Sequence, residues 1–325
     1  MMPIAPALIA ALGCAAVLWL MLRFYAARLP LDHPNTRSLH DKPIPRIGGV
    51  GVLAGVALAG AAGTAPFAPV FAIALILAGI SFIDDLHRLP VTLRLAAHLG
   101  AAAITVWYVL SPMNVFELAL LALAVAWLTN LYNFMDGSDG LAAGMAIIGF
   151  GTYAMAAWWG GDAELAPFCS ALAGAALGFL AFNFHPARAF LGDVGSIPLG
   201  FLAGALGIVG WRNDLWPLWF PVLVFAPFIA DATMTLIRRA WRRERIWKAH
   251  REHYYQRLVQ MGWGHRGTAY AAYALMAACG TGALFGRDQP LAVQLGVLAA
   301  ALVMLAGVAI WIDWRWSRHG YRGAR

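Results

Sequence analysis

The feature that most constrains this chain is a series of apolar segments, each close to the length needed to cross a lipid bilayer. Only 12% of its 325 residues are charged, whereas a soluble domain carries roughly a quarter of its residues as Asp, Glu, Lys and Arg. About 20 apolar residues in a helix span the hydrocarbon layer. Soluble and disordered folds are therefore excluded, and we expect one all-α polytopic membrane domain covering residues 1–325.

We expect eleven transmembrane helices. No positive charge precedes the first segment, whereas Arg23 and Arg28 follow it, so it is interpreted as a retained helix with its N-terminus outside rather than as a cleaved signal peptide. The predicted spans are Ile4–Phe24, Gly48–Gly63, Phe67–Ile83, Leu93–Leu110, Leu118–Thr129, Leu141–Trp159, Ala166–Phe182, Ile197–Val209, Trp216–Ile237, Ala269–Phe285 and Leu291–Ile312.

The distribution of positive charge supports this count. With eleven crossings, 21 of the 23 Lys and Arg residues fall in segments on one side, and only Arg212 and Arg287 fall on the other. Positive residues concentrate on the cytoplasmic side of membrane proteins. The cytoplasmic segments are therefore 23–46, 84–94, 130–140, 183–196, 238–266 and a short basic tail, 313–325.

Polar motifs occupy these cytoplasmic segments. In the first, Pro43 and Pro45 predict an extended chain, and Gly48-Gly49 opens the next helix with free backbone N–H groups. The cations of this loop could bind an anionic group or could serve only to orient the chain in the membrane; they are Arg37, Lys42 and Arg46. At the end of the third span, the adjacent carboxylates Asp84 and Asp85 favour a functional role, because two like charges at a bilayer edge are costly.

Two further motifs carry oxygen-bearing side chains. Asn130, Asn133, Asp136 and Asp139 recur every three residues, so a helix would place them on one face. Carboxylate and amide oxygens suit a hard cation such as Mg²⁺, or a face turned toward uridine. In the 183–196 segment, Asp193 stands between two glycines, where its carboxylate can reach a metal ion.

The last polar loop, 238–266, contains nine Lys and Arg residues and the run His250 to Arg257. Attraction to anionic lipid explains part of this charge. Histidine, arginine and tyrosine together also suit a diphosphate and a sugar. Within the spans, we interpret His98 as a packed residue and Asp231 as one partner of an internal ion pair, because an unpaired carboxylate there is expensive.

Together these motifs resemble the polyprenyl-phosphate N-acetylhexosamine-1-phosphate transferase superfamily, glycosyltransferase family 4. The resemblance runs from about Asn35 to Arg257 in the family's order: Pro-Arg-x-Gly-Gly, Asp-Asp, Asn-x-x-Asn-Phe-x-Asp-Gly-x-Asp-Gly-Leu, Asn-x-x-Pro-Ala-x-x-Phe-x-Gly-Asp-x-Gly-Ser and a His/Arg loop. The last loop is similar to that of members that initiate O-antigen synthesis. It departs from the triple histidine of the phospho-MurNAc-pentapeptide translocases, which puts that substrate in doubt.

The resemblance implies that a UDP-N-acetylhexosamine donates its sugar-1-phosphate to undecaprenyl phosphate, with release of UMP. It implies a multi-pass protein of the bacterial cytoplasmic (inner) membrane that acts in O-antigen or other cell-envelope polysaccharide synthesis. Mg²⁺ is the expected cofactor, with Mn²⁺ as the alternative. A homodimer is compatible with the resemblance, membrane lipid is an expected partner, and nucleic acid is not.

The resemblance also implies roles for individual residues. Asp193 is the expected Mg²⁺ ligand and Asn133 the second ligand, while Asp84 would act as base or orienting carboxylate with support from Asp85. The nucleotide pocket would be formed by Asp136, Asp139, Asn183 and Phe190. The diphosphate or sugar would be bound by His250, Arg251 and His253, and the lipid phosphate by Arg46 and Arg94.

Two mechanisms are open: direct attack by the lipid phosphate, or a phospho-sugar intermediate on an aspartate. We favour direct attack, because a phosphate oxyanion needs positioning more than activation. Among other functions, a secondary transporter would place its carboxylates near the bilayer midplane. A CDP-alcohol phosphotransferase would need a different sequence after Asp136-Gly137.

Overall fold

The computed structural model describes residues 3–25, 28–34, 38–39, 41–64, 68–87, 89–245 and 250–322. Arg37 and Arg88 lie outside this part of the chain. The elements, in chain order, are α1 (Ile4–Phe24), β1 (Leu31–Asp32), β2 (Ile44–Pro45), α2 (Gly48–Ala59), the π-helical turn η2 (Gly60–Thr64), α3 (Ala68–His87), α4 (Val91–Leu110), α5 (Val115–Phe134), α6 (Leu141–Trp159), α7 (Leu165–Asn183), α8 (Asp193–Arg212), α9 (Trp219–Val224), α10 (Ala226–Trp241), α11 (Tyr254–Leu258), the π-helical turn η3 (Val259–Trp263), α12 (Gly264–Gly286) and α13 (Leu291–Arg322).

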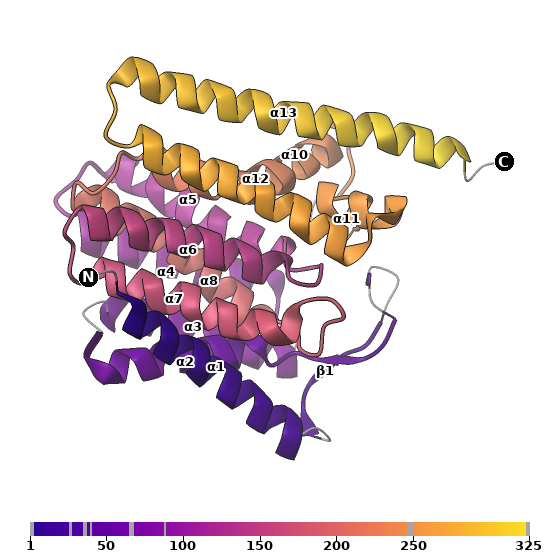
Figure 1. Ribbon diagram of the computed structural model, residues 1–325, viewed down its shortest axis with the longest axis horizontal. Coiled ribbons are helices and arrows are strands. Elements are labelled where there is room, and N and C mark those ends of the chain that lie inside the picture. The colour runs from indigo at the N-terminus through magenta and orange to yellow at the C-terminus, as the bar shows by residue number, and fades with distance from the viewer. Residues whose placement is uncertain are drawn as a thin grey trace.

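The long helices form a bundle with the two chain termini at opposite ends (Figure 1). Helix α8 lies at its centre, where every residue from Val194 to Gly210 is buried. Helix α13 instead lies along the outside of α12 (Figure 1), and most of its surface is exposed. Because its exposed side chains are largely apolar, including Leu302, Val303 and Ile310, this face is suited to contact with lipid rather than water.

Each of the eleven predicted spans contains helix within the described residues, but two of them do not form one long helix. In the described part of the chain, nine helices are long and apolar enough to cross a membrane, while 48–63 forms a shorter apolar helix. The 216–237 segment is divided into α9 and α10 at Phe225. Proline does not fit a helix interior, and Pro227 accordingly lies at the start of α10. The exact number of crossings therefore stays a prediction.

Several helix boundaries differ from those expected. Helix α5 continues to Phe134 and α8 begins at Asp193, so polar motif residues lie within the end turns of helices rather than in separate loops. Helix α13 runs without a break to Arg322. The expected tail is therefore mainly a continuation of the last helix, with residues 323–325 outside the described structure.

Small residues let the N-terminal helices pack closely. A Cβ atom added at Gly55 of α2 would lie 2.4 Å from the Ala10 carbonyl oxygen of α1. One added at Gly174 of α7 would lie 2.1 Å from the Ala7 carbonyl oxygen. Such close backbone contacts replace the hydrophobic driving force that is absent between helices in lipid.

A short hairpin carries the chain from α1 into α2. Strands β1 and β2 pair antiparallel, which confirms the extended chain predicted around Pro45. The expectation of free N–H groups at Gly48 and Gly49 is wrong, because they donate to the carbonyl oxygens of Phe190 and Leu191, each at 2.8 Å. The start of α2 is thereby fixed beside the start of α8.

Candidate active site

The predicted cytoplasmic motifs, though far apart in sequence, come together at one end of the bundle. The hairpin binds the 183–196 segment through the Pro45 carbonyl oxygen, which accepts from the Phe190 backbone N–H at 2.8 Å. The 183–196 segment binds the α5–α6 segment through the 2.6 Å contact of His185 Nδ1 with Asp139 Oδ2. In turn, α12 reaches the same loop through His265. The segments that were predicted to lie on the cytoplasmic side thus form one polar site in the structure.

Asp193 and Asn133 lie at the centre of this end of the bundle. Asn133 Nδ2 donates to Asp193 Oδ1 at 2.8 Å and to Ser196 Oγ at 2.9 Å. Asp193 opens α8, where the helix dipole favours a negative charge, and Gly192 precedes it with a φ of 68°, a conformation that glycine adopts at no cost. The two expected metal ligands are therefore neighbours, and the amide oxygen of Asn133 accepts no hydrogen bond from the described residues.

Negative charge accumulates around Arg46. Its guanidinium contacts Asp32 at 2.6 Å and Asp85 at 3.6 Å. Burial lowers the pKa of Arg46, but the hydrogen bond to Asp32 and the charges of Asp32, Asp85 and Asp193 outweigh this and raise it above its usual value. One arginine faces several carboxylates here, which fits a site for a divalent cation with oxygen ligands.

Asp136 belongs to the same group of charges. Burial and then the nearby charge of Asp193 raise the pKa of Asp136 well above its usual value, although Arg46 and a hydrogen bond from the Gly192 backbone lower it. A cation between Asp136 and Asp193 would relieve this repulsion. The expected alignment of Asn130 to Asp139 on one helix face is wrong, because α5 ends at Phe134. Only the two asparagines lie on the helix, and Asn130 Oδ1 lies 3.2 Å from His98 Nδ1.

Asp84 and Arg94, expected in separate roles, bind each other. Asp84 Oδ2 accepts from Arg94 at 2.8 Å, and Oδ1 accepts from the Leu89 backbone at 2.7 Å. The Asp84 side chain is 11% exposed and that of Asp85 25%. Asp85 is therefore the more accessible carboxylate of the pair, while Asp84 holds the turn between α3 and α4.

Asn183, one of the expected nucleotide-pocket residues, forms hydrogen bonds within the protein. It is buried, its Oδ1 accepts from the Gly140 backbone at 2.9 Å, and its Nδ2 donates to the Ala189 carbonyl oxygen at 3.0 Å. The side chain thereby fixes two loops to each other. Phe190 is partly buried beside Arg46, with which it forms a backbone bridge.

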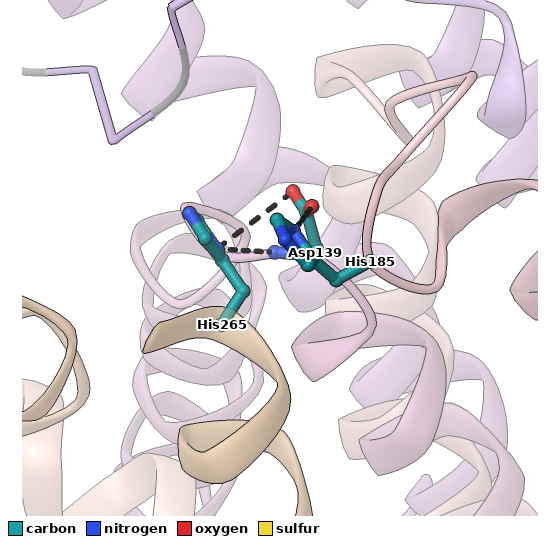
Figure 2. Close-up of side chains that lie close together, drawn as sticks. All are labelled: Asp139, His185 and His265. Carbon is teal, nitrogen blue, oxygen red and sulfur yellow. Dashed lines mark hydrogen bonds and ion pairs between the residues drawn. The ribbon is translucent and has the colours of Figure 1, made fainter. Parts of the chain in front are cut away.

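Asp139 lies between two histidines that our sequence analysis did not assign to a site, His185 and His265 (Figure 2). The rings of the histidines are stacked, with centroids 5.1 Å apart. His185 lies directly before Pro186 in the 183–196 motif, which was identified from the sequence. His265 follows Gly264 at the start of α12, and its only sequence signal was its place in the basic segment.

The His/Arg loop is ordered by Asp231. Its Oδ1 accepts from the Tyr254 backbone at 2.9 Å, and its Oδ2 accepts from the Tyr255 backbone at 3.0 Å. Asp231 Oδ1 also lies 3.0 Å from His253 Nδ1. The internal partner predicted for Asp231 therefore exists, and it is buried His253 of the expected sugar-binding motif. This arrangement places His253 inside the protein rather than on its surface.

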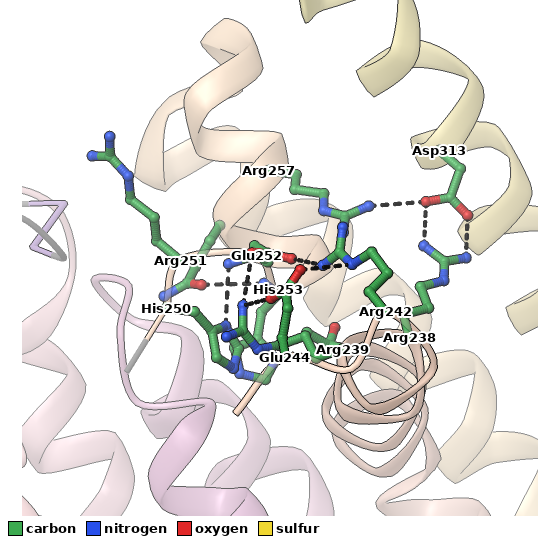
Figure 3. A network of polar contacts seen from close by, with 12 residues as sticks. Arg238, Arg239, Arg242, Glu244, His250, Arg251, Glu252, His253, Arg257 and Asp313 are labelled. Atoms are coloured by element: carbon green, nitrogen blue, oxygen red, sulfur yellow. Dashed lines mark hydrogen bonds and ion pairs between the residues drawn. The ribbon is translucent and has the colours of Figure 1, made fainter. Parts of the chain in front are cut away.

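The rest of the loop forms an ion-pair network (Figure 3). Arg239 contacts Glu252 at 2.7 Å and Glu244 at 2.8 Å, and Arg242 binds the same two carboxylates. Arg251 is exposed and extends away from this network (Figure 3). Among the basic residues expected to bind a diphosphate, Arg251 is thus available to a ligand.

His250 lies between the network and His253. Its ring centroid is 4.9 Å from that of His253. Burial, followed by electrostatic interactions with His253 and Arg239, lowers the pKa of His250 to about 4, although Glu252 and Asp231 oppose the shift. His250 is consequently neutral at physiological pH and can donate and accept hydrogen bonds.

An apolar groove of about 870 Å³ adjoins the polar site. It lies between α10, α12 and α13, and its lining includes exposed Met234 and Leu302. Its lining also includes Met135, which directly follows α5, and Tyr255, whose hydroxyl donates to the Phe134 carbonyl oxygen at 3.1 Å. The groove therefore joins the outer surface of the helices to the polar loops.

The described residues form a helical bundle with nine membrane-length helices and a carboxylate-rich site at one end, and this defines a polytopic membrane protein. Residues 67–211 match the model of glycosyl transferase family 4. The chain is 32% identical over 264 residues to the "Probable undecaprenyl-phosphate N-acetylglucosaminyl 1-phosphate transferase" of Bacillus subtilis, covering 75% of this chain and 74% of that protein. It therefore belongs to the polyprenyl-phosphate N-acetylhexosamine-1-phosphate transferase superfamily.

Other relatives differ in how much of the chain they match. The "Decaprenyl-phosphate N-acetylglucosaminephosphotransferase" of Mycobacterium tuberculosis is 30% identical over 345 residues, covering 89% of this chain and 83% of that protein. The "Phospho-N-acetylmuramoyl-pentapeptide-transferase" of Geobacillus thermodenitrificans is 51% identical, but over 81 residues and only 25% of each chain.

Proposed function

We propose that this protein transfers N-acetylhexosamine-1-phosphate from a UDP-sugar to undecaprenyl phosphate at the bacterial inner membrane. The products are undecaprenyl diphosphate-sugar and UMP, and the reaction would be the first membrane step of O-antigen or another cell-envelope polysaccharide. The names of the two relatives matched over most of the chain state a polyprenyl-phosphate acceptor and an N-acetylglucosaminyl group. The short match to the muramoyl-pentapeptide enzyme makes that donor the less favoured alternative.

The observation that carries the proposal is the apolar groove that ends beside the polar site. An acceptor lipid has a long hydrocarbon chain and one phosphate, so it needs an apolar path joined to a cationic, metal-binding surface. The groove, whose lining includes Met135 and Tyr255 beside the polar loops, provides such a path. A secondary transporter with a midplane site is less well supported, because the carboxylates described above lie at the end of the bundle.

In this proposal the polar site divides its work between donor and acceptor. Arg46 and Arg94 bind the lipid phosphate, while Arg251 and neutral His250 bind the diphosphate or the sugar. Asp136, Asp139 and Phe190 border the nucleotide, and Asn183 and His253 hold the loops that carry these residues. Asp85, the more accessible carboxylate, orients the acceptor, and Asp84 positions Arg94 through their 2.8 Å contact.

We infer direct attack as the chemical step. A lipid phosphate oxygen forms a bond to the β-phosphorus of the UDP-sugar while the bond from that phosphorus to the bridging oxygen breaks, and the electron pair leaves with UMP. Because the nucleophile is already an oxyanion, the protein's main task is to hold both reactants in line.

We expect Asp193 and Asn133 to hold Mg²⁺, or Mn²⁺ as the alternative, with the carboxylates of Asp85 and Asp136 nearby. When bound, the ion would neutralise charge on the donor diphosphate. The donor set supports this expectation, because it consists of carboxylate and amide oxygens and faces an excess of negative charge around Arg46.

Purified protein tests this proposal directly. With Mg²⁺, undecaprenyl phosphate and a radiolabelled UDP-sugar, we expect a butanol-extractable labelled lipid. UDP-GlcNAc is the first donor to test, followed by UDP-FucNAc, UDP-QuiNAc and UDP-MurNAc-pentapeptide. Chelation of divalent ions with EDTA should stop the reaction, and added Mg²⁺ should restore it.

The variant Asp193→Asn should lower turnover by about 1,000-fold or more, in the range lost when a principal transition-state contact is removed. Asp288→Asn is the matched control, because Asp288 is exposed near the opposite end of α12. An Asp193→Asn protein that is folded and turns over at the wild-type rate would remove the metal assignment. Failure of every donor to label the lipid would remove the proposed reaction.

A further inference from the structure

Three segments far apart in sequence bring Asp139, His185 and His265 together. Asp139 lies in the loop before α6, His185 in the loop after α7, and His265 at the start of α12 (Figure 2). One ligand atom from each residue lies within 4.8 Å of the others. His185 Nδ1 is 2.6 Å from one carboxylate oxygen of Asp139, and His265 Nδ1 is 3.8 Å from the other.

The charge of Asp139 is compensated only weakly. Its side chain is 7% exposed, and a buried carboxylate is costly unless it is paired or binds a metal ion. Within the described residues, the only side chains close enough to pair with it are the two imidazoles, and an imidazole carries a positive charge only when it is protonated. The Ala187 backbone N–H adds a hydrogen bond at 3.2 Å. A cation between the carboxylate and the imidazoles would supply the missing positive charge.

The orientation of His265 suits a metal ligand. Its Nε2 lies 3.1 Å from the Leu39 carbonyl oxygen, an acceptor, so this nitrogen carries the proton. Nδ1 is then an acceptor that takes hydrogen bonds from Ser138 Oγ at 2.9 Å and from the Asp139 backbone N–H at 3.2 Å, so its lone pair faces the cluster and a bound ion would replace these hydrogen bonds. Metal-bound histidines commonly donate their second ring N–H to a backbone carbonyl, which fixes the tautomer in this way.

We propose that Asp139, His185 and His265 bind a divalent transition-metal ion of the Zn²⁺ class. Two imidazole nitrogens and one carboxylate oxygen are a common set of three protein ligands for Zn²⁺, with a fourth position for water or a hydroxyl such as that of Ser138. Neighbouring ligand atoms in such a tetrahedron are roughly 3.3 Å apart. The three ligand atoms lie within 4.8 Å of one another, with Asp139 at 2.6 Å from His185 and 3.8 Å from His265, so side-chain shifts would bring them around one ion.

This ion differs from the Mg²⁺ proposed at Asp193, whose surroundings offer oxygen ligands only. Its role is structural. It ties the N-terminal end of α12 to the loops that carry Asp136 and Phe190, and so holds two sides of the polar site together. The proposal does not depend on which donor or acceptor the protein uses.

Metal binding to the purified full-length protein tests this site. The protein is first stripped with a chelator, then titrated with Zn²⁺ against a chromophoric competitor in excess Mg²⁺. We expect one Zn²⁺ per chain. Zn²⁺ binding should be roughly 100-fold weaker in His185→Ala and His265→Ala, because losing a residue that only hydrogen-bonds to a metal ligand already lowers metal affinity by about 10–100-fold. His319→Ala is the matched control, because His319 is exposed on α13, and it should bind Zn²⁺ like the wild type.

The wild-type protein gives a second readout that needs no variant to fold. Co²⁺ added to the stripped protein should produce the strong visible absorption of a tetrahedral site, and Zn²⁺ should abolish it. Absence of both this spectrum and stoichiometric Zn²⁺ binding would overturn the proposal, leaving a hydrogen-bonded Asp139–His185 pair. Equal Zn²⁺ affinity in the folded His185→Ala and His319→Ala proteins would also overturn it.

Discussion

His250 illustrates how one side chain in the loop before α11 makes the protein sensitive to acid. Its pKa is lowered to about 4, chiefly by burial, while in an unfolded chain it is about 6.5. Between these values the unfolded state binds the proton more readily than the folded state. The contribution of His250 to stability is therefore complete above pH 6.5 and is lost progressively as the pH falls toward 4.

We predict that His250→Gln weakens the loss of stability between pH 6.5 and 4. Glutamine keeps a polar side chain of similar length but does not take up a proton. Thermal unfolding of the purified protein, followed across this pH range in one detergent, measures the effect. The exposed residue His319 provides the control through His319→Gln, which should retain the wild-type slope. Identical slopes for wild type and His250→Gln would contradict the lowered pKa.

At the level of elements, Asp313 connects the three helices α10, α11 and α13. From α13 it binds Arg238 of α10 and Arg257 of α11, the latter at 3.0 Å (Figure 3). Arg257 is 8% exposed, so it loses its charged partner if Asp313 is replaced. The same guanidinium lies over the rings of Tyr254 and Trp316. The last helix is therefore held against the His/Arg loop near its C-terminal end.

We predict that Asp313→Asn lowers the free energy of unfolding by about 2 kcal/mol, the usual cost of removing one partner of a charged hydrogen bond. Asp288→Asn removes a carboxylate that is 68% exposed and should have a much smaller effect. Thermal or denaturant unfolding in detergent compares the two. Equal stability of both variants would mean that the Asp313 contacts do not stabilise the native state.

Over the whole molecule, patterns local in sequence predicted the helices and the motif positions, whereas pairings across the chain were not predictable. Apolar length revealed α6 and α7 almost to the residue. Three contacts depend on how the helices pack. They are the contacts of Asp84 with Arg94, of Asp231 with His253, and of Asp139 with His265. The sequence predicted a tail from Asp313 onward, because this charge follows the last apolar segment. Helix α13 nevertheless continues past Asp313 to Arg322.

The orientation of the whole molecule is open to a labelling test. All three natural cysteines are buried, so an introduced thiol can be read against a low background. We predict that Gly161→Cys, in the α6–α7 turn, reacts with a membrane-impermeant maleimide in intact cells. Arg243→Cys, after α10, should react only after lysis. The opposite pattern would reverse the orientation predicted from the positive charges.

The central claim is that the β-phosphate travels with the sugar, and a doubly labelled donor tests it most directly. UDP-GlcNAc, or whichever donor proves active, carries ³²P in the β-phosphate and ³H in the sugar, and is incubated with the purified protein, Mg²⁺ and undecaprenyl phosphate. We predict that the lipid product contains both labels in a one-to-one ratio and that UMP is released in equal amount. A lipid that carries ³H without ³²P, with UDP as the released nucleotide, would contradict sugar-phosphate transfer and indicate simple glycosyl transfer.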